Sequence, residues 1–248
     1  MKQEKTISMV RKTVAWLLCL TMVFLSLPSA ASLSPDEIGN PSVTDLPIEE
    51  TEKRTAETKT FLMPDGTHTF RSYGTLVHKP APDGTWAEID NRLIKDGETG
   101  GFVTADGLET VHFAADTPAV SVETEKGKLS WTVAPYEGES LEKALASVTD
   151  VTDTAWYKSS SPEEQAMVAA KLDGAISYAF PERSLRVDYS VSPGTVKENF
   201  VLLAPADGRF KLTLSGLTAE QKEQTVSLFN EEGEELFVIS APYIETAY

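Results

Sequence analysis

The stretch that decides the fold class is Leu185-Arg186-Val187-Asp188-Tyr189-Ser190-Val191. Apolar and polar residues alternate in it, so an extended chain would carry one apolar face and one polar face. Ser192-Pro193-Gly194-Thr195 follows with residues typical of a turn, and Lys197–Leu203 (KENFVLL) then returns the chain. The pattern predicts an antiparallel β-hairpin with one buried face.

The same pattern recurs on both sides of this hairpin. Val120–Glu123 and Leu129–Val133 alternate with period two and predict a second hairpin. Asp-Gly pairs favour tight turns, because Asp bonds local backbone and Gly accepts a positive φ. Among such pairs are Asp65-Gly66, Asp83-Gly84, Asp106-Gly107 and Asp207-Gly208. We therefore predict a mainly β fold, an antiparallel β-sandwich or meander, with strand blocks at residues 58–136 and 175–248.

Residues 137–174 between the two blocks predict a helical insertion. Leu141, Ala144, Leu145 and Val148 fall at helical spacing. Ser161-Pro162-Glu163-Glu164 is typical of a helix start, with Ser as cap, Pro at the first position and Glu three residues after the cap. Gly174 is expected to end this helix, and residues 150–160 are expected to form a loop.

The N-terminus has the order of features found in secretory signal peptides. Basic residues precede the apolar run Val14–Leu25, and Ser29-Ala30-Ala31 supplies small residues for cleavage. The run is shorter than the roughly 20 residues that cross a bilayer, which favours a cleaved signal over residues 1–31 above a retained anchor. Residues 32–57, which are charged and contain no aromatic residue, predict a disordered linker. We expect a protein that is secreted or associated with the cell wall.

Charge and cysteine content exclude several function classes. Residues 1–31 hold four of the 22 basic residues and one of the 38 acidic residues, which leaves a formal charge of −19 on residues 32–248. Such a charge repels nucleic acid and anionic lipid, so we expect no nucleic-acid partner, and membrane contact only through the uncleaved signal. Cys19 is the single cysteine, and its removal with the signal excludes disulfides and thiol catalysis.

No motif predicts a metal, a cofactor or a catalytic residue. His68, His78 and His112 lack the spacing of helical zinc motifs. Asp90 and Asp188 each lie in an apolar strand context and have two interpretations. They are either acid/base carboxylates or partners of nearby Arg92 and Arg186, and we favour the second interpretation.

Two further expectations concern side chains on strands. Lys197 and Glu198 are expected to form cross-strand ion pairs on the solvent face. Trp156, Tyr73 and Tyr136 are the candidate binding residues, because exposed aromatic rings can stack on sugars. Trp86 and Trp131 occupy alternating strand positions and are expected in the core.

Four further blocks of the sequence form a recognisable series: Gly84–Leu93 (GTWAEIDNRL), Tyr178–Tyr189 (YAFPERSLRVDY), Val196–Leu202 (VKENFVL) and Leu236–Tyr243 (LFVISAPY). In their order and spacing they resemble the N-terminal region of Gram-positive wall-associated proteins and RHS (YD) repeat proteins, including those that carry DNRLRE domains. The resemblance implies a structural region that precedes repeats and, in some members, an effector domain. It brings no catalytic residues with it.

Three functions remain open at this point. We favour a non-catalytic structural module of a secreted or cell-surface protein, whose partners would be cell-wall glycan or downstream domains. The alternative is a carbohydrate-binding module that works through the exposed aromatic rings, and an acid/base hydrolase is less favoured. Because no polar tail follows the last apolar strand before Tyr248, we expect the chain to be the front end of a longer polypeptide or a truncated relative of one.

Overall fold

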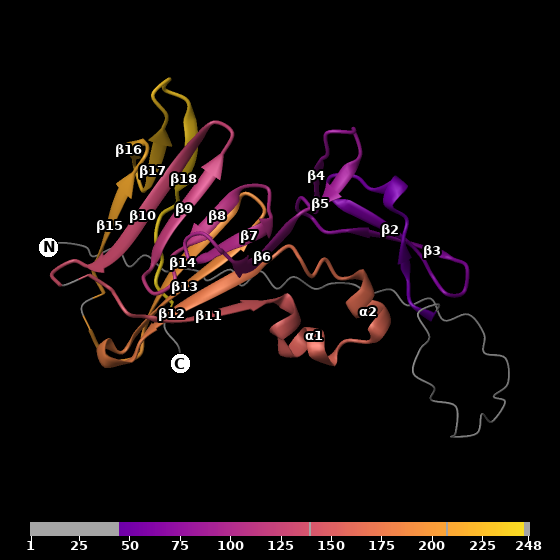
Figure 1. Ribbon diagram of the computed structural model, residues 1–248, viewed down its shortest axis with the longest axis horizontal. Helices are drawn as coiled ribbons and strands as arrows, with labels where there is room; N and C mark the ends of the chain where they lie inside the picture. The colour runs from indigo at the N-terminus through magenta and orange to yellow at the C-terminus, as the bar shows by residue number, and fades with distance from the viewer. Residues whose placement is uncertain (1–44, 139, 207, 246–248) are drawn as a thin grey trace, which may run out of the picture. The chain divides into compact units, whose positions relative to one another are not determined.

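The computed structural model describes residues 45–138, 140–206 and 208–245. The predicted signal peptide (1–31) and the first part of the predicted linker (32–44) lie outside the described residues. The described part is mainly β with antiparallel sheets, which confirms the fold class predicted from the alternating pattern (Figure 1).

The largest sheet has six strands in the order β15-β10-β9-β8-β7-β6. Its strands are β6 (Asp90–Lys95), β7 (Phe102–Asp106), β8 (Thr110–Phe113), β9 (Ala119–Thr124), β10 (Gly127–Pro135) and β15 (Phe210–Ser215). A second sheet has the order β11-β12-β13-β14. Its strands are β11 (Leu145–Asp150), β12 (Gly174–Phe180), β13 (Leu185–Ser192) and β14 (Thr195–Leu202). β13 and β14 are the hairpin predicted around Pro193-Gly194.

One hydrophobic core joins these two sheets into a sandwich. Alternate residues of β12 and β13 are buried, and they pack with side chains from β6 to β10. The Tyr189 ring lies 5.4 Å from the Phe113 ring across the core and 6.0 Å from the Tyr178 ring on the neighbouring strand. Apolar burial of this kind is the main favourable term in folding, at about 25 cal/mol per Å².

The two predicted strand blocks are not separate units. β15, from the second block, pairs with β10, from the first, with Trp131 opposite Leu214. Side chains of both blocks also share one core. Periodicity along the chain identifies a strand but not its partner, because a strand pairs with whichever edge the tertiary fold presents.

The predicted insertion is only partly helical. The helices are α1 (Ala155–Ser159) and α2 (Pro162–Met167), and the Ser161 hydroxyl oxygen accepts the Glu164 backbone N–H at 3.2 Å, which confirms the predicted cap. The helix predicted from Leu141 to Val148 is wrong, because residues 141–144 have no regular secondary structure and the chain from Leu145 onward is β11, which pairs with the edge of β12. α1 lies where a loop was expected. Gly174 does not end a helix, because it begins β12.

Smaller sheets come before and after the sandwich strands in the sequence. The N-terminal strands are β1 (Ile48–Glu49), β2 (Thr58–Leu62) and β3 (His68–Ser72) in one sheet, and β4 (His78–Pro80) with β5 (Trp86–Glu88) in another. The C-terminal sheet holds β16 (Thr218–Lys222), β17 (Thr225–Phe229) and β18 (Glu235–Ile239). Short 3₁₀ turns lie at Thr51–Lys53, Val151–Asp153 and Pro181–Arg183. Order therefore begins before Thr58, so the predicted linker is too long at its C-terminal end.

Two turns of the N-terminal sheets have the same construction. The Asp65 carboxylate accepts the Thr67 backbone N–H at 2.9 Å and its hydroxyl at 2.6 Å. Asp83 accepts the same groups of Thr85 at 3.0 and 2.6 Å. Gly66 and Gly84 follow these Asp residues with φ of +82° and +83°, a conformation that Gly adopts without steric cost. This confirms the predicted turn chemistry at Asp65-Gly66 and Asp83-Gly84, whereas Gly107 does not have a positive φ and Asp207 lies outside the described residues.

Candidate functional site

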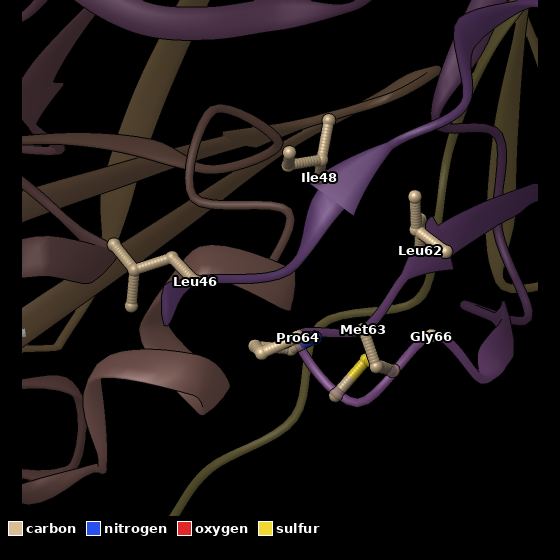
Figure 2. A pocket seen from close by; sticks show the side chains of 6 residues that line it. All are labelled: Leu46, Ile48, Leu62, Met63, Pro64 and Gly66. Atoms are coloured by element: carbon tan, nitrogen blue, oxygen red, sulfur yellow. The ribbon is translucent and has the colours of Figure 1, made fainter. Parts of the chain in front are cut away.

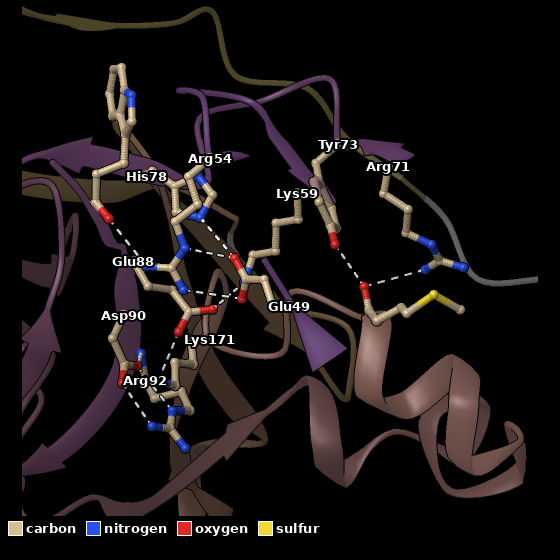
Figure 3. Close-up of polar contacts among 12 residues, drawn as sticks. Glu49, Arg54, Lys59, Arg71, Tyr73, His78, Glu88, Asp90, Arg92 and Lys171 are labelled. Atoms are coloured by element: carbon tan, nitrogen blue, oxygen red, sulfur yellow. Dashed lines mark hydrogen bonds and ion pairs between the residues drawn. The ribbon is translucent and has the colours of Figure 1, made fainter. Parts of the chain in front are cut away.

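The most concentrated group of charges in the described chain is a cluster of six side chains, which we call the ion-pair cluster. It consists of Glu49, Arg54, Lys59, His78, Glu88 and Lys171 (Figure 3). Residues 49–59 lie on or beside β1 and β2, His78 and Glu88 lie on β4 and β5, and Lys171 precedes β12. The cluster thus joins three segments that are far apart in the sequence.

Lys59 is the centre of this cluster. It lies on β2 at the same parity as the core residue Phe61, so the alternation of the strand directs it inward, and it is 4% exposed. Its ammonium group contacts Glu49 Oε2 at 3.3 Å and Glu88 Oε1 in a short ion pair. A charge buried to this degree is stable only when it is paired, because desolvation costs several kcal/mol per ion.

The remaining members complete the pairing of the two carboxylates. Arg54 Nε and Nη2 donate to the two oxygens of Glu49 at 2.7 and 3.1 Å, which is bidentate geometry. Lys171 Nζ donates to Glu88 Oε2 at 2.9 Å. His78 Nδ1 donates to the Thr55 carbonyl oxygen at 2.5 Å, while Nε2 has no hydrogen-bond partner among the described residues and lies 3.6 Å from Glu49 Oε1.

The pKa shifts of the cluster follow from this pairing. Burial acts to raise the pKa of Glu88, but hydrogen bonds from Lys59 and Lys171 outweigh it and lower that pKa to about 2. Burial and the pairing with Arg54 and Lys59 compete in the same way at Glu49, and its pKa is lowered. Burial also lowers the pKa of His78, which favours neutral imidazole. At neutral pH the cluster therefore holds two ionised, fully paired carboxylates and a neutral histidine.

A second set of polar contacts ties α2 to β3 (Figure 3). The Tyr73 hydroxyl donates to the Met167 carbonyl oxygen at 2.7 Å, and Arg71 Nη2 pairs with Glu164 Oε2 at 2.8 Å. Burial raises the pKa of Tyr73 to about 12. The Tyr73 ring packs on the small core of Val77, Ile89 and Leu172. This candidate binding residue therefore has a packing role.

Asp90 and Asp188 are paired with arginine, as the favoured interpretation predicted. Asp90 accepts Arg92 Nε at 2.9 Å and Nη2 at 2.7 Å. Asp188 accepts Arg186 Nε at 2.8 Å. In each pair the two residues are two positions apart on one strand, so their side chains lie on the same face.

Glu198 does not lie on the solvent face, and that prediction is wrong. It faces Tyr189 across the β13–β14 register, inside the sandwich, and Trp131 Nε1 donates to its Oε1 at 3.1 Å. The buried Tyr189 hydroxyl lies beside the carboxylate without a well-formed hydrogen bond. Burial raises the pKa of Glu198, and the hydrogen bond from Trp131 does not offset it. Its strand neighbour Lys197 points the other way, as period-two alternation requires.

Replacing Glu198 by Gln should therefore stabilise the protein at neutral pH. The ionised carboxylate is disfavoured in the interior, whereas Gln keeps an acceptor for Trp131 without the charge. A raised folded pKa costs stability as pH rises above the ordinary value of 4.5. Thermal unfolding should show a Tm gain of roughly 2–4 °C at pH 7, equivalent to about 1 kcal/mol, that disappears near pH 4. A loss of stability, or a gain independent of pH, would contradict this assignment.

The other two histidines have carboxylate neighbours. His68 Nδ1 lies 2.8 Å from Glu50 Oε2, and His112 Nδ1 lies 3.6 Å from Asp96 Oδ2. In residues 45–138, 140–206 and 208–245, no group of three His, Cys, Asp or Glu side chains is placed to hold a metal ion. None of the helices in the same ranges is long and apolar enough to cross a membrane.

The described surface includes the following two hollows. One, of about 230 Å³, is a mainly apolar recess beside β1 and the β2–β3 turn (Figure 2). Its lining is Leu46, Ile48, Leu62, Met63, Pro64 and Gly66. The other, of about 480 Å³, is a groove at the β10–β15 end of the six-stranded sheet, and Tyr136 is among its lining residues. We call this second hollow the Tyr136 groove.

The three candidate binding residues lie on different elements. Trp156 is on α1 and 54% exposed, Tyr136 follows β10 and is 57% exposed, and Tyr73 is packed. No ring contact joins them among the described residues. Sequence reasoning missed Lys59, although its place on the apolar parity of β2 was a visible signal. It also missed Glu49, because its segment was expected to be disordered.

No family model, no curated protein and no solved structure matches the chain.

Proposed function

We propose that the chain is a non-catalytic structural module of an exported protein, placed outside the cell or in the cell wall. The ion-pair cluster carries this proposal. Its carboxylates are ionised and each is held by two cations, which leaves neither free to accept or deliver a proton at neutral pH. Such a cluster stabilises a fold by joining β1–β2, the β4–β5 hairpin and the segment before β12.

The stretch that resembles exported wall-associated and RHS-repeat proteins supports the same proposal. Within Gly84–Leu93, Glu88 belongs to the ion-pair cluster, Ile89 is fully buried, and Asp90 pairs with Arg92. Asn91, which is 1% exposed, donates from its side chain to the Leu172 carbonyl oxygen at 2.7 Å. Each of these residues has a structural use, which fits a module that precedes other domains in those proteins.

The competing function is acid/base hydrolysis of wall polymers, and one assay separates the two. The full chain, purified from a bacterial host that exports it, should release no reducing ends or muropeptides from peptidoglycan and wall polysaccharide. Asp90→Asn and Asp188→Asn are the variants to compare. Hydrolysis that either substitution abolishes would refute the proposal. Fractionation of the same cells should place the chain in the medium or the wall, and its recovery from the cytoplasm alone would refute export.

A further inference from the structure

The Tyr136 groove has a lining unlike that of the ion-pair cluster, with which it shares no residue. Its floor is the outward face of three neighbouring strands. Thr132 of β10 lies opposite Ala119 of β9 and Thr213 of β15, and Ala134 lies opposite Lys211 one step further along. The side chains of this floor are short apart from Lys211, so they do not fill the groove. The Thr132 and Thr213 hydroxyls and the Lys211 ammonium group lie on the same face of the sheet.

One wall of the groove is an exposed aromatic ring. Tyr136 directly follows β10, and its backbone N–H donates to the Arg209 carbonyl oxygen at 3.0 Å, which fixes the chain there. The Arg209 guanidinium lies 5.1 Å from the centre of the ring. The Tyr136 side chain nevertheless remains 57% exposed, so the ring offers apolar area to a ligand at little entropic cost.

We propose that the Tyr136 groove binds an uncharged oligosaccharide. A sugar presents C–H groups that pack on an aromatic ring and hydroxyls that both donate and accept, and the groove offers both kinds of contact. Tyr136 stacks on one sugar ring, while Thr132, Thr213 and Lys211 meet its hydroxyls from the floor. The volume of about 480 Å³ lies in the range of small-molecule sites, which is roughly 300–1,000 Å³.

Charge and burial distinguish this ligand from the alternatives. The formal charge of −19 on residues 32–248 disfavours an anionic polymer, and Lys211 and Glu142 place one charge of each sign at the groove. An apolar peptide would need exposed hydrophobic pockets for its anchors. The large aliphatic residues of the groove, Val133 and Leu141, are 4% and 2% exposed and so offer none.

Titration calorimetry of the full chain with neutral oligosaccharides tests the proposal. The probes are cellotetraose, xylotetraose and the tetramer of N-acetylglucosamine, and at least one should bind. Tyr136→Ala should weaken that binding by about tenfold or more, whereas Tyr136→Phe keeps the ring and should change it by less than about threefold. Thr213→Val should weaken it as well, because it removes a hydroxyl from the floor at nearly constant volume.

Trp156→Ala is the matched control, since Trp156 is equally exposed but lies on α1, outside the groove. It should leave the affinity unchanged, and all four variants should unfold at the wild-type temperature within about 2 °C. Binding that survives Tyr136→Ala or is lost in Trp156→Ala would overturn the proposal. So would the absence of binding to all three probes, or binding of an acidic polysaccharide or a peptide alone. None of these outcomes bears on the structural role of the ion-pair cluster.

Discussion

Replacing Lys59 by Met should lower the free energy of unfolding by about 3 kcal/mol, the scale measured when one partner of a buried ion pair is removed. Met is about as long as the aliphatic part of the Lys side chain, so the packing is nearly unchanged. The loss of stability therefore measures the effect of removing the charge. Glu49 and Glu88 would each keep one cation, Arg54 and Lys171. Both carboxylates would nevertheless stay partly buried, each with one cationic partner in place of two.

Urea unfolding of the wild type and the variant measures this difference. The matched control is Lys128→Met, which breaks an ion pair with Glu123 whose side chains are 56% and 42% exposed, and which should cost less than about 1 kcal/mol. Replacing Glu88 by Gln together with Lys59→Met should recover part of the loss, because one uncompensated charge is then removed. Equal costs for Lys59→Met and Lys128→Met would contradict a structural role for the cluster.

The effect of Lys59→Met also depends on pH with a definite sign. The folded-state pKa of Glu88 is lowered from 4.5 to about 2, so its pairing stabilises the fold fully above pH 4.5. This contribution is lost as the pH falls through about 2, where the carboxyl is protonated in both states. The stability gap between wild type and Lys59→Met should therefore shrink between pH 4.5 and pH 2. A gap that stays constant or widens over this range would show that lost packing, rather than charge, causes it.

Replacing Gly174 by Ala should cost about 3 kcal/mol, the upper part of the range for overpacked sites. A Cβ at this position would lie 2.2 Å from the Asn91 carbonyl oxygen and 3.3 Å from the Arg92 Cα. Both neighbours are backbone atoms, so no side chain can rotate away. β12 would have to move from β6, and the hydrogen bond from the Asn91 N–H to the Lys171 carbonyl oxygen, now 2.7 Å, would be stretched.

Gly97→Ala is the matched control for this substitution. A Cβ at Gly97 meets no atom within 4 Å, and the residue does not have a positive φ. The change should be neutral or stabilise the fold by up to about 1 kcal/mol, because it restricts the unfolded chain. Thermal and urea unfolding should rank the chains as Gly97→Ala, wild type, Gly174→Ala. A Gly174→Ala variant as stable as wild type would mean that β12 and β6 do not approach so closely.

Features that depend on near neighbours in the chain were predictable. Four such features involve residues of one turn or of two adjacent strands. They are the β13–β14 hairpin, the two Asp-Gly-Thr turns, the Ser161 cap of α2 and the Asp90–Arg92 pair. Their partners lie close in sequence, so periodicity and side-chain chemistry suffice to identify them.

Features that depend on distant partners were not predictable in the same way. β11 was expected to be helical, because Leu145 and Val148 also fit helical spacing, and the free edge of β12 decided otherwise. Glu198 was expected in solvent, but its face of β14 is covered by Trp131 from the other sheet. The candidate site shows the same limit, since Lys59, Glu88 and Lys171 meet only when three distant segments pack together.

The alternation in Leu185–Val191 and its counterparts thus determines by itself that this is a β protein built from antiparallel hairpins. A period of two is a property of each strand alone, and every extended strand with one apolar face must bury that face. Only the tertiary structure decided that β15 joins β10, that one core spans both strand blocks, and that Glu49, Lys59 and Glu88 meet. Those outcomes depend on which surfaces remain free once the hairpins form, and that choice is made by packing between distant segments.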